Sequence, residues 1–328
     1  MRITKWAMVP VILTHLLGTE VSNSNMNKAV TITAVGDVTL AGHFNKKMEE
    51  LKKNAYSYPF SQVKKHLEDS ITIANLETAL TEHEGKTPKK FNFKGKPEYT
   101  KCLTAGSIEI VNIANNHSFD YGEKGLEDTI KALERENIAY CGGGLNIEKA
   151  REPKIVEKDG IKIAFLGYAQ VGREFKAREN KPGIAPGIED YVKEDVRKAK
   201  EKSDIVVVSF HYGVELAEKP NEQQKKISRT AIDSGADIVL GHHPHVVQGI
   251  EKYKQGIIFY SLGNFCFGGN SNPTDKDSFI AKIKVNKYGI QELDIIPVKT
   301  SSGKNNFQPY EAEGIEKDRI TKKIMGRL

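Results

Sequence analysis

Short runs of β-branched and other hydrophobic residues recur along the chain from residue 29 onward, with charged amphipathic stretches between them. Several of these runs are continuously hydrophobic, as is typical of strands covered on both faces. Strands that alternate with helices indicate a layered α/β fold. The pattern predicts strands at residues 30–35, 71–74, 108–113, 161–167, 205–210, 238–240, 257–260 and 279–285.

The amphipathic stretches and the turn residues predict the connections between these strands. Residues 86–96 are polar and contain Pro88, so we expect a surface loop or hairpin there. Residues 176–187 contain two Pro-Gly pairs and predict a long irregular connection. Helices are predicted where hydrophobic residues recur on one face of a charged segment. These segments are residues 125–136, 188–202 and 221–233.

The first 25 residues differ from the rest of the chain. Arg2 and Lys5 precede a hydrophobic run that reaches Leu17, and a polar segment follows. This order is typical of an export signal, and an N-terminal core helix is the alternative. The hydrophobic run is shorter than the roughly 20 residues of a membrane-spanning helix. Without a repeat or a long linker, we expect one domain over residues 29–300 and a loosely packed polar tail over residues 301–328.

Composition narrows the class of protein further. Of 328 residues, 28% are charged and 38% are hydrophobic, which suits a soluble globular protein. The net charge is +6, and basic and acidic residues are interleaved along the chain. The sequence has no stripe of basic residues interleaved with aromatic residues, so nothing in it favours nucleic-acid binding. Cys102, Cys141 and Cys266 are widely spaced and predict buried thiols rather than a disulfide framework.

The candidate chemistry lies where the predicted strands end. Functional side chains in α/β folds collect at such positions. Five strands end in carboxylate, amide or imidazole groups, which are donors for divalent metal ions. A single donor residue at the end of a strand is commonly structural. Five strands that all end in donor residues for unrelated structural reasons are a poor explanation of the pattern. The polar residues at these ends are Asp37, Asn75, Glu77, Asn115, Asn116, His117, His211, His242, His243 and His245.

Some of these residues also have ordinary structural interpretations. An extended segment around Pro244 would place His243 and His245 on one side. Asp37 follows Gly36 and could instead cap a turn, and the Asn pair at residues 115–116 could form an Asx turn.

Two acidic residues near the strand ends have open roles. Asp120 is expected to cap the helix that opens near Gly122, and it is close enough in sequence to orient His117. Glu215 follows His211 by four residues and is either part of the site or an ordinary surface acid.

The order of these motifs resembles one known family. The segments GDVTLAG, IANLETAL, NIANNHSFDYG, SFHYGVE, GHHPHVVQGIE and YSLGNF resemble the CapA family of poly-γ-glutamate capsule biosynthesis proteins, over residues 29–267. That family is similar to the calcineurin-like metallophosphoesterases. The resemblance implies an αββα sandwich of metallophosphatase type, with mixed sheets.

The resemblance also implies a role for each motif residue. His117 would be a general acid or a hydrogen-bond donor to the transition state. Glu77 would be shared between two metal positions. The mixed nitrogen and oxygen donors suit manganese, iron or zinc, and leave the choice among them open. The residues implied to bind one or two divalent ions are Asp37, Glu77, Asn116, His211, His243 and His245. The residues implied to orient these ligands are Asn75, Asp120, Glu215 and His242.

One position departs from the metallophosphoesterase pattern. Thr39 stands where those enzymes have a histidine ligand, and the shared carboxylate is a glutamate. Asn75 or His43 could replace the missing ligand. The sequence therefore leaves open whether one metal ion binds or two.

The resemblance implies a protein of the cell envelope that helps to make, extend or release poly-γ-glutamate. Its partners would be that anionic polymer and membrane-bound synthase components. A pair of metal ions would serve hydrolysis of a phosphoester or of a γ-glutamyl amide equally well. The alternatives are a secreted metal-dependent phosphoesterase and a non-catalytic scaffold stabilised by metal.

Overall fold

The computed structural model describes residues 28–51, 55–270, 272–300 and 307–328. The expected export signal over residues 1–25 lies outside these ranges. Among the helices of the described ranges, none has the length and hydrophobicity needed to cross a bilayer.

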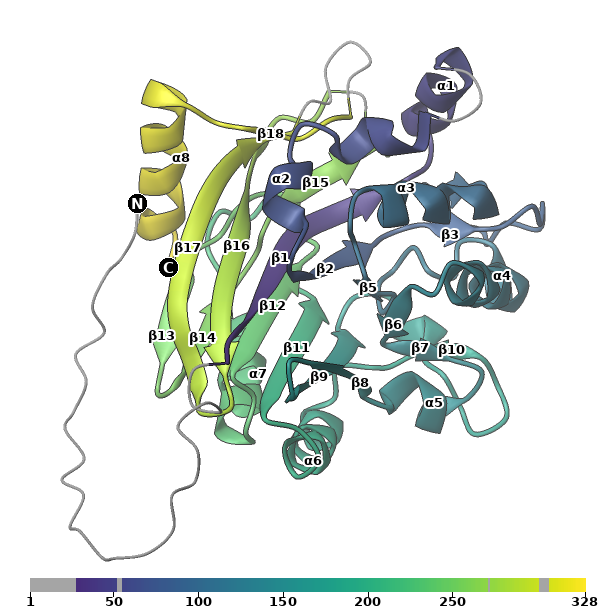
Figure 1. Cartoon of the computed structure of the whole chain (residues 1–328). Helices are drawn as coiled ribbons and strands as arrows, with labels where there is room; N and C mark the ends of the chain where they lie inside the picture. Colours follow the sequence, from purple (N-terminus) through teal and green to yellow (C-terminus); the bar gives the residue numbers. More distant parts are fainter. Residues whose placement is uncertain (1–27, 52–54, 271, 301–306) are drawn as a thin grey trace, which may run out of the picture.

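An eight-stranded mixed sheet forms one half of the molecule (Figure 1). Its strand order is β18-β17-β16-β1-β2-β5-β6, and β15 pairs with β1 beyond the end of β16. β1 is parallel to β2 and β15 and antiparallel to β16. The bounds are β1 Val30–Thr39, β2 Ile71–Leu76, β5 Ile110–Asn112, β6 Ala139–Cys141, β15 Asn264–Phe267, β16 Asp277–Asn286, β17 Gly289–Lys299 and β18 Tyr310–Glu311.

A six-stranded sheet forms the other half, in the order β13-β14-β12-β11-β9-β8. Its central strands β9, β11, β12 and β14 are parallel. The bounds are β8 Lys154–Lys158, β9 Ile161–Ala169, β11 Ile205–His211, β12 Ile238–His242, β13 Ile250–Tyr253 and β14 Gly256–Phe259. Two short pairs lie outside both sheets, β3 Ala79–Leu80 with β4 Lys94–Gly95 and β7 Gly143–Gly144 with β10 Gly183–Ile184.

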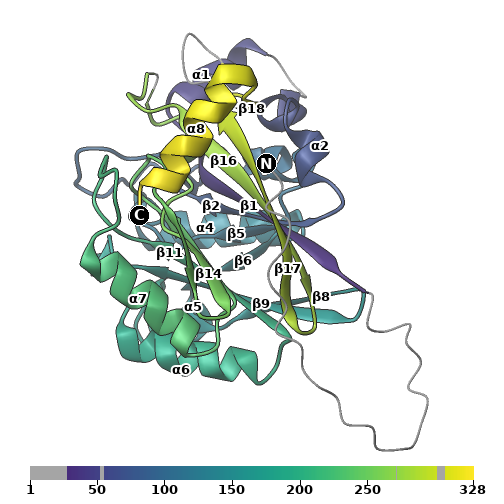
Figure 2. The same cartoon turned by 90° about the vertical axis from the view of Figure 1, so that its left-hand side faces the viewer.

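Helices cover the outer faces of the two sheets. The α-helices are α1 His43–Glu50, α2 Lys64–Leu67, α3 Thr100–Ala105, α4 Gly122–Arg135, α5 Ile147–Arg151, α6 Glu189–Lys200, α7 Glu222–Asp233 and α8 Gly314–Gly326. Short 3-10 turns occupy Ala55–Phe60, Pro97–Tyr99 and Arg173–Phe175. Figures 1 and 2 show α6 and α7 together on the outside of the six-stranded sheet and α4 on the side of the larger sheet.

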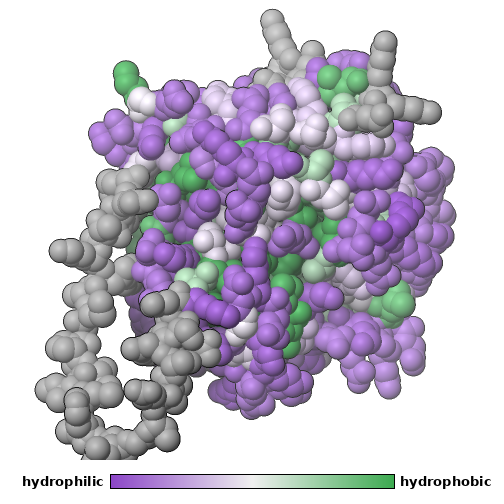
Figure 3. All heavy atoms as spheres, viewed as in Figure 1, coloured by the Kyte–Doolittle hydropathy of each residue, from purple (hydrophilic) through white to green (hydrophobic). Residues whose placement is uncertain are grey.

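The alternation of side chains along the strands produces these layers. In β9, Ile163 and Phe165 pack into the core between the two sheets, whereas Ala164 and Leu166 pack with the residues of α6 and α7. Leu126 and other residues of α4 pack in a separate core on the outer face of the larger sheet. The predicted αββα sandwich with mixed sheets is therefore confirmed. Hydrophilic residues cover most of the face seen in Figure 3.

All eight predicted strands and all three predicted helices are present, with shifted ends. β5 is shorter than the predicted strand at residues 108–113, and β1 extends past the predicted end at residue 35. β8 and β17 were not predicted, because charged residues on their exposed faces interrupt the hydrophobic pattern. Such charges are common on strands near a sheet edge, where they oppose unwanted pairing.

The C-terminal segment corrects the expectation of a loosely packed tail. Ile320 and Ile324 of α8 are buried in the core between the sheets. Arg319 donates two hydrogen bonds to Asp277, each of 2.6 Å, and Lys323 adds a third of 2.6 Å. The helix was missed because its buried hydrophobic positions are few and its other residues are mostly charged.

Replacing Ile320 by alanine tests whether α8 belongs to the core. Because the side chain is fully buried, Ile320→Ala should lower the free energy of unfolding by about 2–5 kcal/mol. Ile315→Ala is the matched control, since Ile315 lies in the same helix and is 88% exposed. Urea unfolding followed by circular dichroism measures both, and equal effects would contradict the packing described.

Candidate metal centre

The candidate site lies at the carboxyl ends of parallel strands from both sheets. In the larger sheet, Asp37 of β1 is in register with Asn75 of β2. In the smaller sheet, His211 of β11 is in register with His242 of β12. Parallel strands have their carboxyl ends at the same end of the sheet. The packing of β1 near β12 brings these ends of the two sheets together.

Asp37 lies within β1, at a bulge in the strand, so the turn-capping interpretation is wrong. Its Oδ1 accepts a 2.9 Å hydrogen bond from Asn75 Nδ2. His242 Nδ1 lies 3.2 Å from Oδ1, and His245 Nδ1 lies 3.3 Å from Oδ2. Burial alone would raise the pKa of Asp37, but these two imidazoles outweigh burial and hold the pKa well below its usual value.

Glu77 is fully buried, and neither of its carboxylate oxygens has a hydrogen-bond partner among the described residues. Its Oε1 lies 3.5 Å from His211 Nε2, 3.8 Å from His245 Nε2 and 3.9 Å from His117 Nε2. Burial raises the pKa of Glu77 well above its usual value, and the charge of the nearby His245 opposes this effect only in part. A divalent cation at this point would supply further positive charge.

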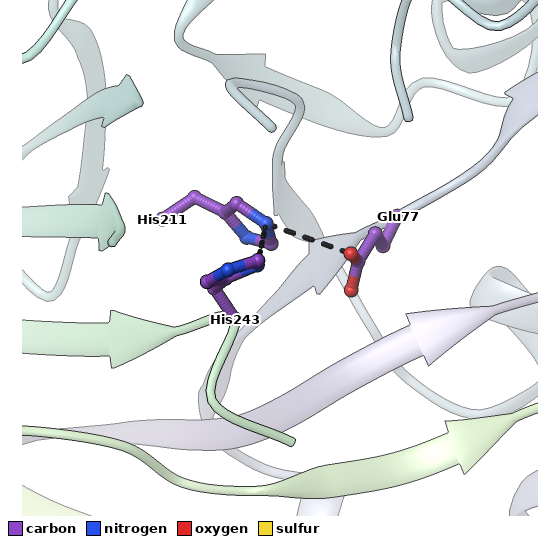
Figure 4. A group of neighbouring side chains, drawn as sticks. All are labelled: Glu77, His211 and His243. Carbon is purple, nitrogen blue, oxygen red and sulfur yellow. Dashed lines mark hydrogen bonds and ion pairs between the residues drawn. The ribbon is translucent and has the colours of Figure 1, made fainter. Parts of the chain in front are cut away.

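Two groups of donor atoms meet at Glu77. One contains Glu77, His211 and His243, and the other contains Asp37, Glu77 and His245. Within each group the donor atoms lie within 4.8 Å of one another. Figure 4 shows the first group, with the three side chains pointing toward one another from three separate segments. The donor chemistry fits divalent metal ions that accept mixed oxygen and nitrogen ligands.

Asn116 extends the first group. Its Oδ1 lies 2.7 Å from His211 Nε2, and His211 Nε2 lies 3.1 Å from His243 Nδ1. The structure thus brings all six residues of the implied ligand set into one place, and their binding of metal stays a prediction.

His243 and His245 are on strained backbone. His243 has a φ of 95° and His245 has a φ of 58°, so the prediction of an extended segment is wrong. Left-handed backbone at residues other than glycine costs about 1–3 kcal/mol each and is concentrated at functional sites. The two rings nevertheless lie close together, with centroids 5.8 Å apart.

Burial and neighbouring charges give the histidines of the site different pKa values. Burial lowers the pKa of His211 well below its usual value and lowers the pKa of His243 to about 3. Burial would also lower the pKa of His245, but Glu77 and Asp37 raise it to about 9. His211 and His243 are therefore neutral at pH 7, the form in which imidazole binds metal.

His117 lies beside the donor groups and is held on two sides. Its Nδ1 is 2.7 Å from Asp120 Oδ2, and its ring stacks on Phe93 with the centroids 4.1 Å apart. Burial lowers the pKa of His117, and the contact with Asp120 partly offsets this effect. Asp120 does not cap α4, because its oxygens also accept hydrogen bonds from Lys89 Nζ and from the backbone N–H of Phe93.

Sequence reasoning missed three residues of the site. Lys89 and Phe93 belong to the segment that was predicted only as a surface loop. Asn264 lies in the YSLGNF motif, and its Oδ1 lies 2.9 Å from His245 Nδ1. The family resemblance of the YSLGNF motif was the only signal for Asn264. Nothing in the sequence indicated that the loop with Lys89 and Phe93 belongs to the site.

The remaining candidates have more distant positions. Asn115 accepts a hydrogen bond from the backbone N–H of His117, which confirms the Asx turn. His43 is exposed at the start of α1 and belongs to none of the donor groups among the described residues. Thr39 is buried, and its hydroxyl has no partner among the described residues. Glu215 is exposed but shares a donor group with His243 and His245.

The arrangement of the two sheets and their helices is a metallophosphoesterase-like fold. The NAD nucleotidase of Haemophilus influenzae shares the fold, with a TM-score of 0.53 at 13% identity, over 90% of this chain and 55% of the nucleotidase. The chain thus spans about half the length of that enzyme.

Sequence comparison identifies the family. Residues 31–269 match the family described as bacterial capsule synthesis protein PGA_cap. The chain is 34% identical to the capsule biosynthesis protein CapA of Bacillus anthracis over 84% of this chain and 69% of that protein. It is also 34% identical to the PGA biosynthesis protein CapA of Bacillus subtilis over 80% of this chain and 70% of that protein. The chain belongs to the PGA_cap family.

Substitution of Glu77 tests the central feature of the site. Glu77→Gln removes a buried carboxyl group that has no hydrogen-bond partner among the described residues, so the metal-stripped variant should be at least as stable as the wild type. Adding Mn²⁺ should stabilise the wild type, by about 2.7 kcal/mol at about 100 times Kd, and should stabilise the variant much less. Calorimetric melting with EDTA and with Mn²⁺ measures both effects. Equal stabilisation of the two proteins by Mn²⁺ would exclude Glu77 as a ligand.

Proposed function

We propose that this protein is an exported, metal-dependent hydrolase of the cell envelope that acts in the synthesis or processing of poly-γ-glutamate. The observation that supports a hydrolase is the pair of donor groups that share the buried carboxylate of Glu77. Membership of the PGA_cap family supports the polymer as substrate, because its relatives in Bacillus are named for capsule and PGA biosynthesis. Membrane-bound synthase components are the proposed partners.

Charge is compatible with such a substrate. Poly-γ-glutamate has one free carboxylate in each unit, and the protein has a net charge of +6. A basic protein attracts a polyanion over the distance of the Debye length, about 10 Å at 0.1 M salt. The attraction is modest at this net charge, so orientation at the site has to come from local contacts.

Divalent ions bound at Glu77 would supply a Lewis acid and an activated water at neutral pH. Asp37, Glu77, Asn116, His211, His243 and His245 would hold these ions. The site is buried, which keeps bulk water away from the reacting centre and strengthens each electrostatic contact.

His117 is suited to move a proton to the leaving group. Its Nδ1 faces Asp120, so Nδ1 carries a proton, and Nε2 would take a proton from the attacking water and then release it to the leaving group. Nε2 points toward Glu77, at 3.9 Å from Oε1. Stacking on Phe93 limits rotation of the ring, and Lys89 offsets the charge of Asp120. The leaving group is the amine of a γ-glutamyl amide in this proposal.

A phosphoesterase is the second candidate for the function. The arrangement around His117 suits a phosphoesterase as well as it suits a hydrolase of γ-glutamyl amides. A general acid beside a buried carboxylate–imidazole cluster serves the leaving oxygen of a phosphoester as well as the nitrogen of an amide. A metal-stabilised scaffold without activity would retain the donor groups but turn over neither substrate.

Binding of poly-γ-glutamate should depend on salt. We expect affinity at about 20 mM salt that weakens steadily toward about 300 mM, because counterions screen the attraction between the two partners. Fluorescence anisotropy with a labelled polymer measures this, and a neutral polymer such as dextran is the control. Absence of binding at low salt would rule out the polymer as a partner.

Hydrolysis should require both metal and His243. With Mn²⁺, the protein should cleave either γ-glutamyl amides or a generic phosphodiester, and EDTA should abolish the activity. His243→Ala should lose more than the about 10- to 100-fold that follows loss of a group supporting a ligand. His83→Ala is the control, since His83 is exposed and outside the donor groups. Full activity of His243→Ala would refute a metal-dependent reaction at this site, and metal binding without any turnover would favour the scaffold.

A further inference from the structure

The turn after β11 places an exposed carboxylate over the candidate metal centre. A carboxylate oxygen of Glu215 and nitrogens of His243 and His245 all lie within 4.8 Å of one another. These two histidines belong to different donor groups at Glu77. Glu215 therefore stands on the solvent side of the site and within reach of both metal positions.

Backbone hydrogen bonds hold this turn in place. Tyr212 N–H donates to His242 O at 3.1 Å, and Leu216 N–H donates to Pro244 O at 2.9 Å, so the turn is fastened to the histidine segment on both sides of Glu215. Gln248 Nε2 donates to Ala217 O at 2.8 Å. The position of Glu215 relative to the two histidines is thus set by the same contacts that shape the site.

The turn contains strain that hydrophobic packing does not explain. Leu216 has a φ of 61°, a conformation that costs about 1–3 kcal/mol for a residue other than glycine. Val214 and Leu216 are each 57% exposed, so the turn does not form in order to bury them. What it achieves is the placement of the side chain between them, Glu215, toward His243 and His245.

The second donor group needs an additional ligand. Asp37, Glu77 and His245 supply three side chains, which leaves positions at a divalent ion for a water and for a further side chain. Thr39 and His43 do not supply it, since Thr39 is outside the donor groups and His43 is exposed elsewhere.

We infer that Glu215 is a metal ligand that completes the position formed by Asp37, Glu77 and His245. This inference rests on the proposed metal-dependent function. Three carboxylates and one imidazole form an oxygen-rich set, and such sets suit Mn²⁺ better than sites rich in imidazole. Glu215 therefore determines both the occupancy of the second position and its preference for Mn²⁺.

Titration of the full-length, metal-stripped protein with Mn²⁺ tests this role. Calorimetry and electron paramagnetic resonance give the number of bound ions, their affinities and the magnetic coupling of an adjacent pair. The wild type should bind two coupled ions. Glu215→Gln should keep one ion, weaken the second by at least about tenfold and lose the coupling. Its melting temperature without metal should match the wild type, because Glu215 is exposed.

Glu218→Gln is the matched control. Glu218 lies three residues further along, forms an ion pair with Arg327 and is outside the donor groups. The substitution Glu218→Gln therefore removes the same charge as Glu215→Gln without removing a proposed ligand. Two tightly bound ions in Glu215→Gln, or equal losses in both variants, would overturn the role of Glu215 and leave the proposed function intact. A wild type that binds no Mn²⁺ would instead refute the proposed function, and the inference with it.

Discussion

A buried carboxylate, which has no hydrogen-bond partner in the part of the chain that the structure describes, lies where the two sheets meet, and the site is organised around it. Removing Glu77 from water is costly unless positive charge compensates it. Three imidazoles surround its Oε1, from segments that are far apart in the sequence. This interaction links the larger sheet, which holds Glu77, to the smaller sheet, which holds His211. The sandwich and the site therefore depend on each other.

The segments around Glu77 are positioned at some cost in backbone energy. His243, His245 and Leu216 all have left-handed backbone, and all three lie at the site. Hydrogen bonds between the turn after β11 and the segment after β12 maintain this arrangement. Two of these three residues, His243 and His245, are themselves candidate metal ligands, so part of the strained backbone of this protein lies at donor residues.

The amphipathic pattern predicted most of the fold because hydrophobic burial acts locally along each element. The central strands of both sheets, such as β1, β9 and β11, were predicted, since both of their faces are covered and their sequences are largely hydrophobic. β17 and α8 were missed for the opposite reason: their buried positions are separated by charged residues. Ion pairs with Asp277 help to hold α8, and such long-range pairs leave no periodic signal in the sequence.

The sequence by itself determined the layered fold and the identity of the donor residues, because strand ends and motif order are local properties of the chain. Only the tertiary structure decided which donors meet, since that depends on how the two sheets pack face to face. It placed Asp37 inside β1, Lys89 and Phe93 against the neighbours of Glu77, and Glu215 beside His243. Those contacts join residues far apart along the chain, and no spacing in the sequence encodes them.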